Sequence, residues 1–196
     1  MAPEPDFARF VSLACHDLRT PLATVSGFAH TLDRLESLGS PADRYVGMIL
    51  AATDQLGELL DELGLVARIE SGRYEPALLD ADTRELASAA AALVGEQADA
   101  DGSGATVRVD REPTERALAG LARCALRHGA LERVHLHANG GEVLIEPINA
   151  DAAAVVLAEE LRDLGAATAH RLVGALGGSV TLERETLHVR LPTGDT

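Results

Sequence analysis

Two long runs of apolar residues, spaced three and four positions apart, restrict the fold more than any other feature of the chain. The first runs from Phe7 to about Leu38, and the second from Met48 to Ile69. Residues at these spacings lie on one face of an α-helix, so each run predicts an amphipathic helix. The Gly39-Ser40-Pro41 segment predicts a turn between them, and Gly72 predicts the end of the second helix. Residues 1–74 are therefore predicted to form an antiparallel helical hairpin.

A hairpin of this kind covers each apolar helix face on one side only. Pairing two copies of the chain into a four-helix bundle buries the apolar surface that remains. The pattern therefore predicts a homodimer whose first domain is a dimeric four-helix bundle.

The periodicity changes after Gly72, where shorter helix and strand patterns alternate. Helices are predicted over Asp82–Ala98 and Glu112–His128, with mostly helix over Ala152–Leu176. Strands are predicted over Thr106–Val109, Arg133–His137, Glu142–Ile148, Ser179–Arg184 and Thr186–Leu191, with a flexible break at Asp99–Gly104. These elements predict an α/β two-layer sandwich with one helical face over residues 75–196, and so an α+β chain.

Charge and hydropathy exclude two classes of partner. The chain has 17 Arg, no Lys and 31 acidic residues, which gives a formal net charge of −14 at pH 7. This charge repels a phosphate backbone, so no nucleic-acid partner is predicted. No apolar run approaches the ~18 to 20 residues of a membrane span, and the opening MAPEPDFARF lacks the basic and apolar parts of a secretion signal. A cytoplasmic protein with no membrane partner is expected.

The segment around His16 holds side chains that can carry chemistry. A neutral imidazole nitrogen is nucleophilic near pH 7, and the adjacent Asp17 carboxylate can accept the ring proton. Thr20 lies one helical turn after His16 on the same face, where its hydroxyl can position a water for dephosphorylation. Pro21 has no N–H group to donate, which predicts a kink or a loosened turn that exposes His16 to a partner.

This segment, FVSLACHDLRTPLATVSGF at residues 10–28, closely resembles the phosphoacceptor box of the histidine kinases of two-component signalling. RIESG at residues 68–72 resembles the end of the second bundle helix in that family. Two matches at the right separation are far more specific than one. The resemblance implies that the partners are the receiver domains of response regulators.

The resemblance also assigns roles to the residues of the box. It implies that His16 is the phosphoacceptor, Asp17 its base and Thr20 the residue that serves phosphatase activity. Arg19 and Pro21 are implied as supporting residues of the box.

The helix face below His16 is expected to contact the receiver domain. Thr20, Ala23 and Gly27 lie along this face. Ala23 and Gly27 are therefore predicted as partner-binding residues.

The second domain resembles the ATPase domain of the same family, with eroded nucleotide motifs. VDREPTERALAGLARCALRHGA at residues 109–130 resembles the ATP-site helix, with Gly120 and Cys124 in the places of two asparagines. The second asparagine ligates Mg²⁺ in the family, and a thiol is a poor ligand for this hard cation. Arg127 and His128 are retained.

The glycine motifs are eroded as well. Asn149, Asp151 and Ala153 stand where the family has an Asp-x-Gly-x-Gly turn, and only Gly165 remains of the early glycines in the second glycine box. Fewer than about 15 residues separate the two boxes, so the mobile lid over ATP is nearly deleted. We predict a degenerate nucleotide site without ATP turnover and no cofactor of the chain's own, with Mg²⁺ supplied by the partner receiver domain.

His135 and His137 share one face of a predicted strand, a spacing that suits metal ligands. The sequence offers no evident third ligand. No metal site is therefore predicted.

The function predicted from these features is that of a histidine phosphotransferase, which shuttles phosphoryl groups between response-regulator aspartates through His16 without ATP. The predicted layout, a dimeric phosphoacceptor bundle followed by a kinase-like domain without ATP, resembles that of dedicated relay intermediates. The alternatives are a histidine kinase with a diverged ATP site, a non-enzymatic module that sequesters a response regulator, and a phosphatase that acts through Thr20.

Overall fold

The computed structural model describes residues 5–34 and 40–193, and at some helical positions, Asp17 among them, it describes the backbone alone. The described chain divides into two compact units, with the boundary between Tyr74 and Glu75. The first unit is helical, and the second combines helices with β-sheet.

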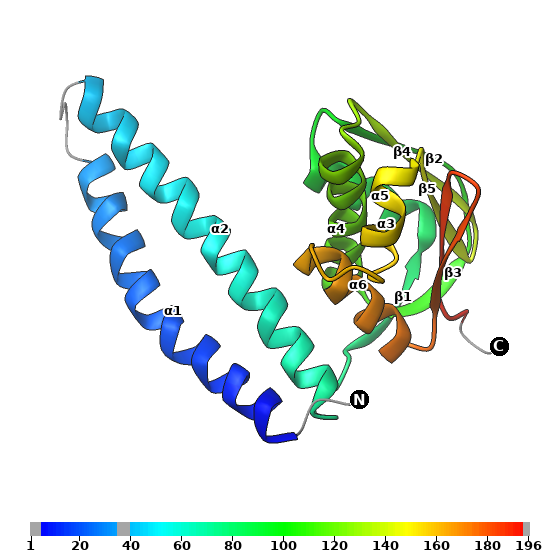
Figure 1. Cartoon of the computed structure of the whole chain (residues 1–196), viewed down its shortest axis with the longest axis horizontal. Coiled ribbons are helices and arrows are strands. Elements are labelled where there is room, and N and C mark those ends of the chain that lie inside the picture. The colour runs from blue at the N-terminus through cyan, green and yellow to red at the C-terminus, as the bar shows by residue number, and fades with distance from the viewer. Residues whose placement is uncertain (1–4, 35–39, 194–196) are drawn as a thin grey trace. The chain divides into compact units, whose positions relative to one another are not determined.

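The first unit is a hairpin of two long helices, α1 (Pro5–Asp33) and α2 (Ser40–Glu70), which pack along one another (Figure 1). The predicted helical hairpin is confirmed. The first helix ends earlier than the predicted Leu38, which lies with Gly39 among residues 35–39, outside the described part of the chain.

The ends of α2 follow local signals. Ser40 is predicted in the turn but begins α2 instead, because Ser followed by Pro is a common start for a helix. Gly72 lies in the turn that follows Glu70, the last residue of α2, so the predicted helix end is confirmed. Its φ of 66° is favourable for glycine, and its N–H group donates to the Ile69 carbonyl at 3.0 Å.

The interface between α1 and α2 buries mostly small side chains. Cys15, Ala29, Val46 and Ala67 are each 4% exposed or less. Nine larger apolar side chains of these helices are at least 41% exposed: Leu18, Val25, Phe28, Leu32, Tyr45, Met48, Ile49, Leu56 and Leu59. One hairpin therefore leaves an extensive apolar surface uncovered.

The second unit is built on a five-stranded sheet in the order β2-β4-β5-β7-β6, with a separate antiparallel pair of β1 and β3. β2 runs parallel to β4, and the other neighbours are antiparallel. The strands are β1 (Leu78–Asp82), β2 (Ala98–Gly104), β3 (Thr106–Asp110), β4 (Val134–Gly140), β5 (Glu142–Glu146), β6 (Ser179–Glu183) and β7 (Thr186–Arg190). The helices are α3 (Thr83–Val94), α4 (Arg111–Gly129), α5 (Ala150–Val156) and α6 (Leu164–Ala175).

Helices cover one face of this sheet. Within β4, Val134, Leu136 and Ala138 are buried, whereas His135 and His137 alternate with them and lie on the opposite face. Figure 1 shows α3, α4, α5 and α6 together on one side of the sheet. The predicted two-layer sandwich is confirmed.

One segment predicted as a flexible break is a strand. Asp99–Gly104 belongs to β2, at the edge of the sheet. The prediction is wrong because Asp, Gly and Ser have low strand propensity, whereas an edge strand needs one ladder only and leaves polar side chains in solvent. Gly102 is required here, because its φ is 102° and a Cβ would collide with the backbone carbonyl of Ala138.

Other differences concern the bounds of elements. The sequence did not predict β1, and the helix predicted from Asp82 to Ala98 is the shorter α3, which Asp82 caps and Gly95 ends. The helical stretch predicted over Ala152–Leu176 is two helices, because residues 157–163 are not helical.

Candidate functional site

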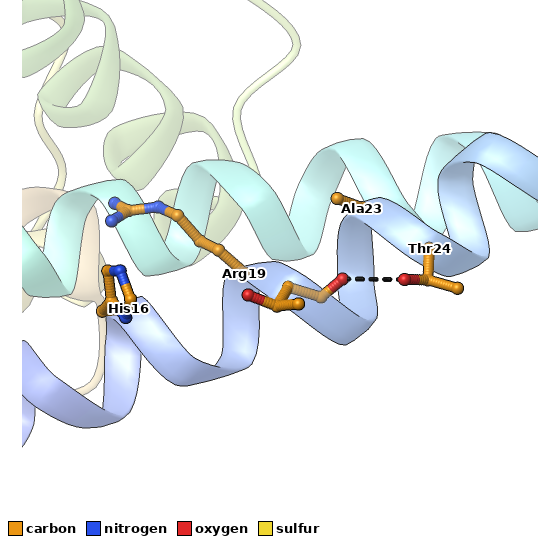
Figure 2. A pocket seen from close by; sticks show the side chains of 5 residues that line it. His16, Arg19, Ala23 and Thr24 are labelled. Carbon is orange, nitrogen blue, oxygen red and sulfur yellow. Dashed lines mark hydrogen bonds between the residues drawn. The ribbon is translucent and has the colours of Figure 1, made fainter.

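The predicted phosphoacceptor residues lie on one exposed face of α1. His16, Arg19, Thr20, Ala23 and Thr24 line an open hollow on the hairpin surface (Figure 2). Their spacing of three or four residues brings them onto adjacent turns of the same helix face. The imidazole of His16 is exposed, as a group that reacts with a partner protein must be.

The helix continues through Pro21 to Asp33. Proline has no N–H group, so the Asp17 backbone carbonyl lacks its usual helical donor. One turn further on, the Thr24 hydroxyl donates a hydrogen bond to the Thr20 carbonyl at 3.0 Å (Figure 2). The Asp17 side chain lies outside the described atoms, so its role as base stays a prediction.

Arg19 connects the two helices of the hairpin. Its guanidinium donates a hydrogen bond to the Asp61 carboxylate of α2 at 2.6 Å. Both side chains are about half exposed, so the ion pair adds little stability and mainly fixes the position of Arg19 beside His16. The sequence had predicted a supporting role for Arg19 but gave no sign of Asp61 as its partner.

The predicted partner-binding residues leave this face open. Ala23 lines the hollow, and Gly27 is exposed one turn beyond it. A Cβ added at Gly27 would meet no atom within 4 Å. The small side chains allow another protein to approach the α1 backbone closely.

In the second unit, several side chains of the region that resembles a nucleotide site contact one another. The Asp163 carboxylate lies 3.0 Å from the Arg127 guanidinium and 3.3 Å from Nε2 of His128. The Asp163 side chain is only 5% exposed, and its other oxygen accepts the N–H of Ala166 at 3.1 Å, capping α6. Asp163 therefore places a carboxylate against the retained Arg127 and His128 of α4.

Cys124 lies next to this carboxylate. It is fully buried on α4, and burial, together with the negative charge of Asp163, raises the pKa of its thiol to about 12. A neutral buried thiol cannot replace the oxygen ligand that Mg²⁺ requires.

Asn149 occupies the place of the family's adenine-binding aspartate, and its side chain is already used. Its amide N–H group donates to the Gly129 carbonyl at 2.8 Å, and its carbonyl accepts the N–H of Ala152 at 3.1 Å, which caps α5. Asp151 and Ala153, in the places of two glycines, lie in α5 rather than in a turn. The sequence left Asn149 able to accept a hydrogen bond from a ligand, whereas the structure shows that it caps a helix.

Gly120 and Gly165 mark a close approach of two helices. A Cβ added at Gly120 would lie 3.4 Å from the backbone carbonyl of Gly165, so α4 and α6 are in contact there. The longer side chain of an asparagine at this position would run into the backbone of α6. Asp163 was not among the predicted site residues, although its place just before a helix is a capping signal.

An exposed histidine on a helical hairpin, joined to an α/β sandwich, resembles the arrangement of phosphoacceptor signalling proteins. Residues 8–72 match the model of the His Kinase A (phospho-acceptor) domain. The histidine protein kinase DivJ of Caulobacter vibrioides is 29% identical over 171 residues, which cover 81% of this chain and 28% of DivJ.

Solved structures show the same fold. Full-length ShkA, solved in complex with AMPPNP, superposes with a TM-score of 0.67 at 23% identity over 96% of this chain and 47% of ShkA. The Acinetobacter baumannii histidine kinase AdeS superposes with a TM-score of 0.58 at 14% identity over 92% of this chain and 98% of that structure.

These similarities support a relationship of the chain to the two-component histidine kinases, with residues 8–72 as the part that matches the phospho-acceptor domain. It spans less than a third of the length of the curated relatives named DivJ, TcrY and DivL. None of the helices within residues 5–34 and 40–193 combines the length and the apolar character needed to cross a bilayer.

Proposed function

We propose that this chain is a histidine phosphotransferase, in which His16 carries phosphoryl groups between response-regulator aspartates without ATP. The observation that supports this most strongly is the contact of Asp163 with Arg127 and His128. A carboxylate held against these two side chains competes with any phosphate that would approach them. The His16 side chain, in contrast, is exposed and lines an open hollow on the hairpin surface.

The proposed transfer needs only an imidazole and an activated phosphate. A neutral ring nitrogen of His16 attacks the phosphorus of a receiver aspartyl phosphate, the N–P bond forms, the O–P bond breaks, and the aspartate leaves as a carboxylate. The second ring nitrogen then carries a proton that needs an acceptor, for which Asp17 is the predicted group. The reverse reaction delivers the phosphoryl group to another receiver.

The receiver domain supplies the remaining parts of the proposed reaction. Its acidic pocket brings the Mg²⁺ that neutralises charge on the transferring group. Docking over Ala23 and Gly27 aligns the aspartate with His16, since small side chains let the two proteins approach closely.

Homodimerisation is part of the proposal. The nine exposed apolar side chains of α1 and α2 are too extensive for a monomer, and two hairpins packed as a four-helix bundle would cover them. Members of this family dimerise through such domains.

Two phosphorylation reactions test the proposal. The purified chain is incubated with Mg²⁺ and γ-labelled ATP, and separately with receiver domains labelled by ³²P-acetyl phosphate. We expect label on the chain from a receiver and none from ATP. His16→Ala should abolish labelling, whereas His30→Ala, which removes another exposed histidine of α1, should retain it. Label from ATP that depends on His16 would overturn the proposal.

A histidine kinase with a diverged ATP site is the second candidate. The observation that favours it is the similar fold of ShkA, which was solved in complex with AMPPNP. Against it stand the capping role of Asn149, the buried thiol of Cys124 and the contact of α4 with α6 at Gly120. The ATP reaction above separates the two candidates.

A further inference from the structure

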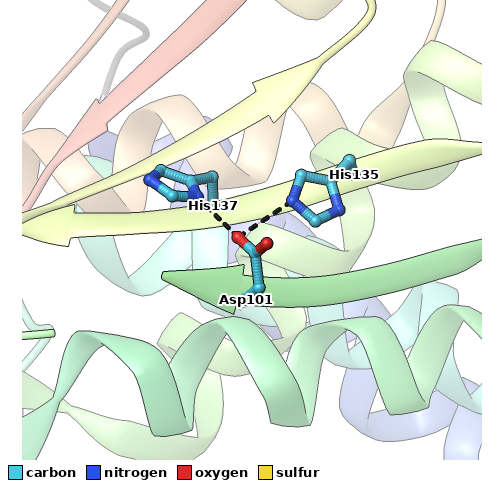
Figure 3. Close-up of side chains that lie close together, drawn as sticks. All are labelled: Asp101, His135 and His137. Carbon is cyan, nitrogen blue, oxygen red and sulfur yellow. Dashed lines mark hydrogen bonds and ion pairs between the residues drawn. The ribbon is translucent and has the colours of Figure 1, made fainter. Parts of the chain in front are cut away.

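A second group of reactive side chains lies on the sheet of the second unit, on the face that the helices leave open. Asp101 of β2 projects toward His135 and His137 of β4 (Figure 3). The parallel register pairs Asp99 with His135 and Asp101 with His137, so alternate residues of both strands share this face. The third ligand that the sequence did not reveal thus comes from the neighbouring strand.

The three side chains converge on one point. Oδ1 of Asp101 lies 3.0 Å from Nε2 of His135 and 2.5 Å from Nδ1 of His137. All three potential ligand atoms lie within 4.8 Å of one another. Tetrahedral zinc, with bonds of about 2.0 to 2.1 Å, spaces its ligand atoms roughly 3.3 Å apart. Small rotations of exposed side chains would open enough room for an ion.

Asp99 contacts the His135 ring on the side away from Asp101. Its carboxylate lies 2.5 Å from Nδ1 of His135, the ring nitrogen turned away from Asp101. A hydrogen bond of this kind fixes the tautomer and the orientation of a metal-binding imidazole, and leaves Nε2 to ligate. Asp99 thus contacts Nδ1 of His135, whereas Asp101 contacts Nε2 of the same ring.

Stability alone explains this cluster poorly. The side chains are 34% exposed at His135, 42% at His137 and 63% at Asp101, and exposed ion pairs contribute little. Charged residues do protect an edge strand from pairing, but that needs no convergence on one point. The formal charge of −14 also favours cation binding at an exposed site.

The other group with suitable residue types, Cys124, His128 and Asp163, fits a metal less well. Burial keeps the Cys124 thiol protonated, whereas a metal requires the thiolate. Arg127 already pairs with Asp163 and would repel a cation.

We propose that Asp101, His135 and His137 bind a divalent first-row transition-metal ion, with Zn²⁺ as the expected ion and Asp99 as a positioning residue. Two imidazoles and one carboxylate suit Zn²⁺, whereas Mg²⁺ and Ca²⁺ prefer sets of oxygen ligands. The ion replaces the protons between Asp101 and the two rings. Three protein ligands leave one coordination position open to water.

Metal titration of the full chain, prepared without a histidine tag and stripped with a chelator, tests the site. Zn²⁺ binding is followed by calorimetry, and Co²⁺ binding by its visible absorption. We expect one ion per chain, with affinity lowered at least about 100-fold by His137→Ala or by His135→Ala. His188→Ala is the matched control, because His188 lies on the same sheet face beside Glu142 and should leave affinity unchanged.

Asp99→Asn tests the positioning role separately. We expect Zn²⁺ affinity to fall by about 10-fold and the Co²⁺ spectrum to shift, since the ligand set remains but the His135 ring is held differently. Circular dichroism and thermal melting check that each variant is folded. Absence of saturable binding up to about 1 mM Zn²⁺, or equal binding after joint replacement of His135 and His137, would overturn the proposal. Neither result bears on phosphotransfer by His16.

Discussion

The two units differ in how they arrange the residues of their kinase-like motifs. On α1, the residues around His16 lie on an open face lined by small side chains. On α4 and α6, the corresponding ATP-site positions are taken up by internal contacts, including the Asp163 carboxylate against Arg127 and His128. The first region is exposed, whereas in the second Arg127, His128 and Asn149 have partners within the chain.

Under the proposed function, the sandwich fold persists without nucleotide contacts. Capping by Asn149 and Asp163 supplies hydrogen bonds within the chain, and Gly120 lets α6 pack against α4. Each of these contacts stabilises the sandwich without a ligand, because it pairs a polar group of the chain or brings two helices together.

Obstruction of the open face should have the largest effect. Gly27→Arg places a long charged side chain where nothing lies within 4 Å, so the hairpin should fold normally while receiver docking is blocked. We expect phosphoryl transfer from a receiver to fall by about 100-fold, measured as the initial rate of labelling of His16.

Gly174→Arg is the matched control for this substitution. Gly174 is also an exposed helical glycine with no atom within 4 Å of an added Cβ, but it lies in α6. It should transfer at the normal rate. Equal rates for Gly27→Arg and Gly174→Arg would show that the receiver docks elsewhere.

Placing the family's asparagine at position 124 should not restore ATP binding and should lower the stability of the fold. Cys124→Asn buries an amide in a site that fits a thiol, so we expect the free energy of unfolding to fall by about 2 to 3 kcal/mol in urea denaturation. No ATP binding should appear, because Asn149 and Asp163 remain engaged. Cys124→Ala should lose less stability. ATP binding by Cys124→Asn would show that a single residue closes the site.

Two substitutions of Asp163 separate its two roles, which are capping of α6 and pairing with Arg127. Asp163→Ala removes the cap of α6 and the anion beside Arg127, and should lower the free energy of unfolding by about 2 kcal/mol. Asp163→Asn retains a capping oxygen but loses the charge, so the loss should be about 1 kcal/mol. Equal losses in the two variants would assign the whole effect to the charge.

Helical periodicity made the hairpin predictable, because apolar spacing over two long segments depends on local geometry alone. The sandwich was predictable for strands with apolar alternation, such as β4. β2 could not be predicted in this way, because its Asp, Gly and Ser residues suit a strand only at the edge of the sheet, where β2 pairs with β4 alone. Local composition carries no information on which strand lies next to another.

The site shows the same limit. Spacing on one helix predicted that His16, Thr20 and Ala23 share a face. The partners that join distant segments, Asp61 for Arg19 and Asp163 for Arg127, depend on tertiary contacts that no local pattern encodes.

The smallest expected effect concerns the pH dependence of the sandwich. His170 of α6 is half-buried, and its ring N–H group donates to the Val156 carbonyl at 2.8 Å. Burial, with a smaller contribution from Arg171, lowers the pKa of His170 below its ordinary value of about 6.5. The unfolded chain therefore takes up this proton first as the pH falls. His170 should lower stability from about pH 6.5 down to its folded-state pKa, with no further change below that.

The contribution of His170 can be isolated by comparison with His170→Gln in urea denaturation between about pH 8 and 5. Comparison with this variant is needed because His135 has the opposite pH dependence in both chains. The pKa of His135 is raised, chiefly by the Asp99 carboxylate, so its contribution to stability is lost as the pH rises. Wild type should lose more stability than His170→Gln on acidification. Parallel pH profiles would mean that the His170 ring is protonated as readily in the folded chain as in the unfolded one, and that the contact between α5 and α6 excludes water less than the structure indicates.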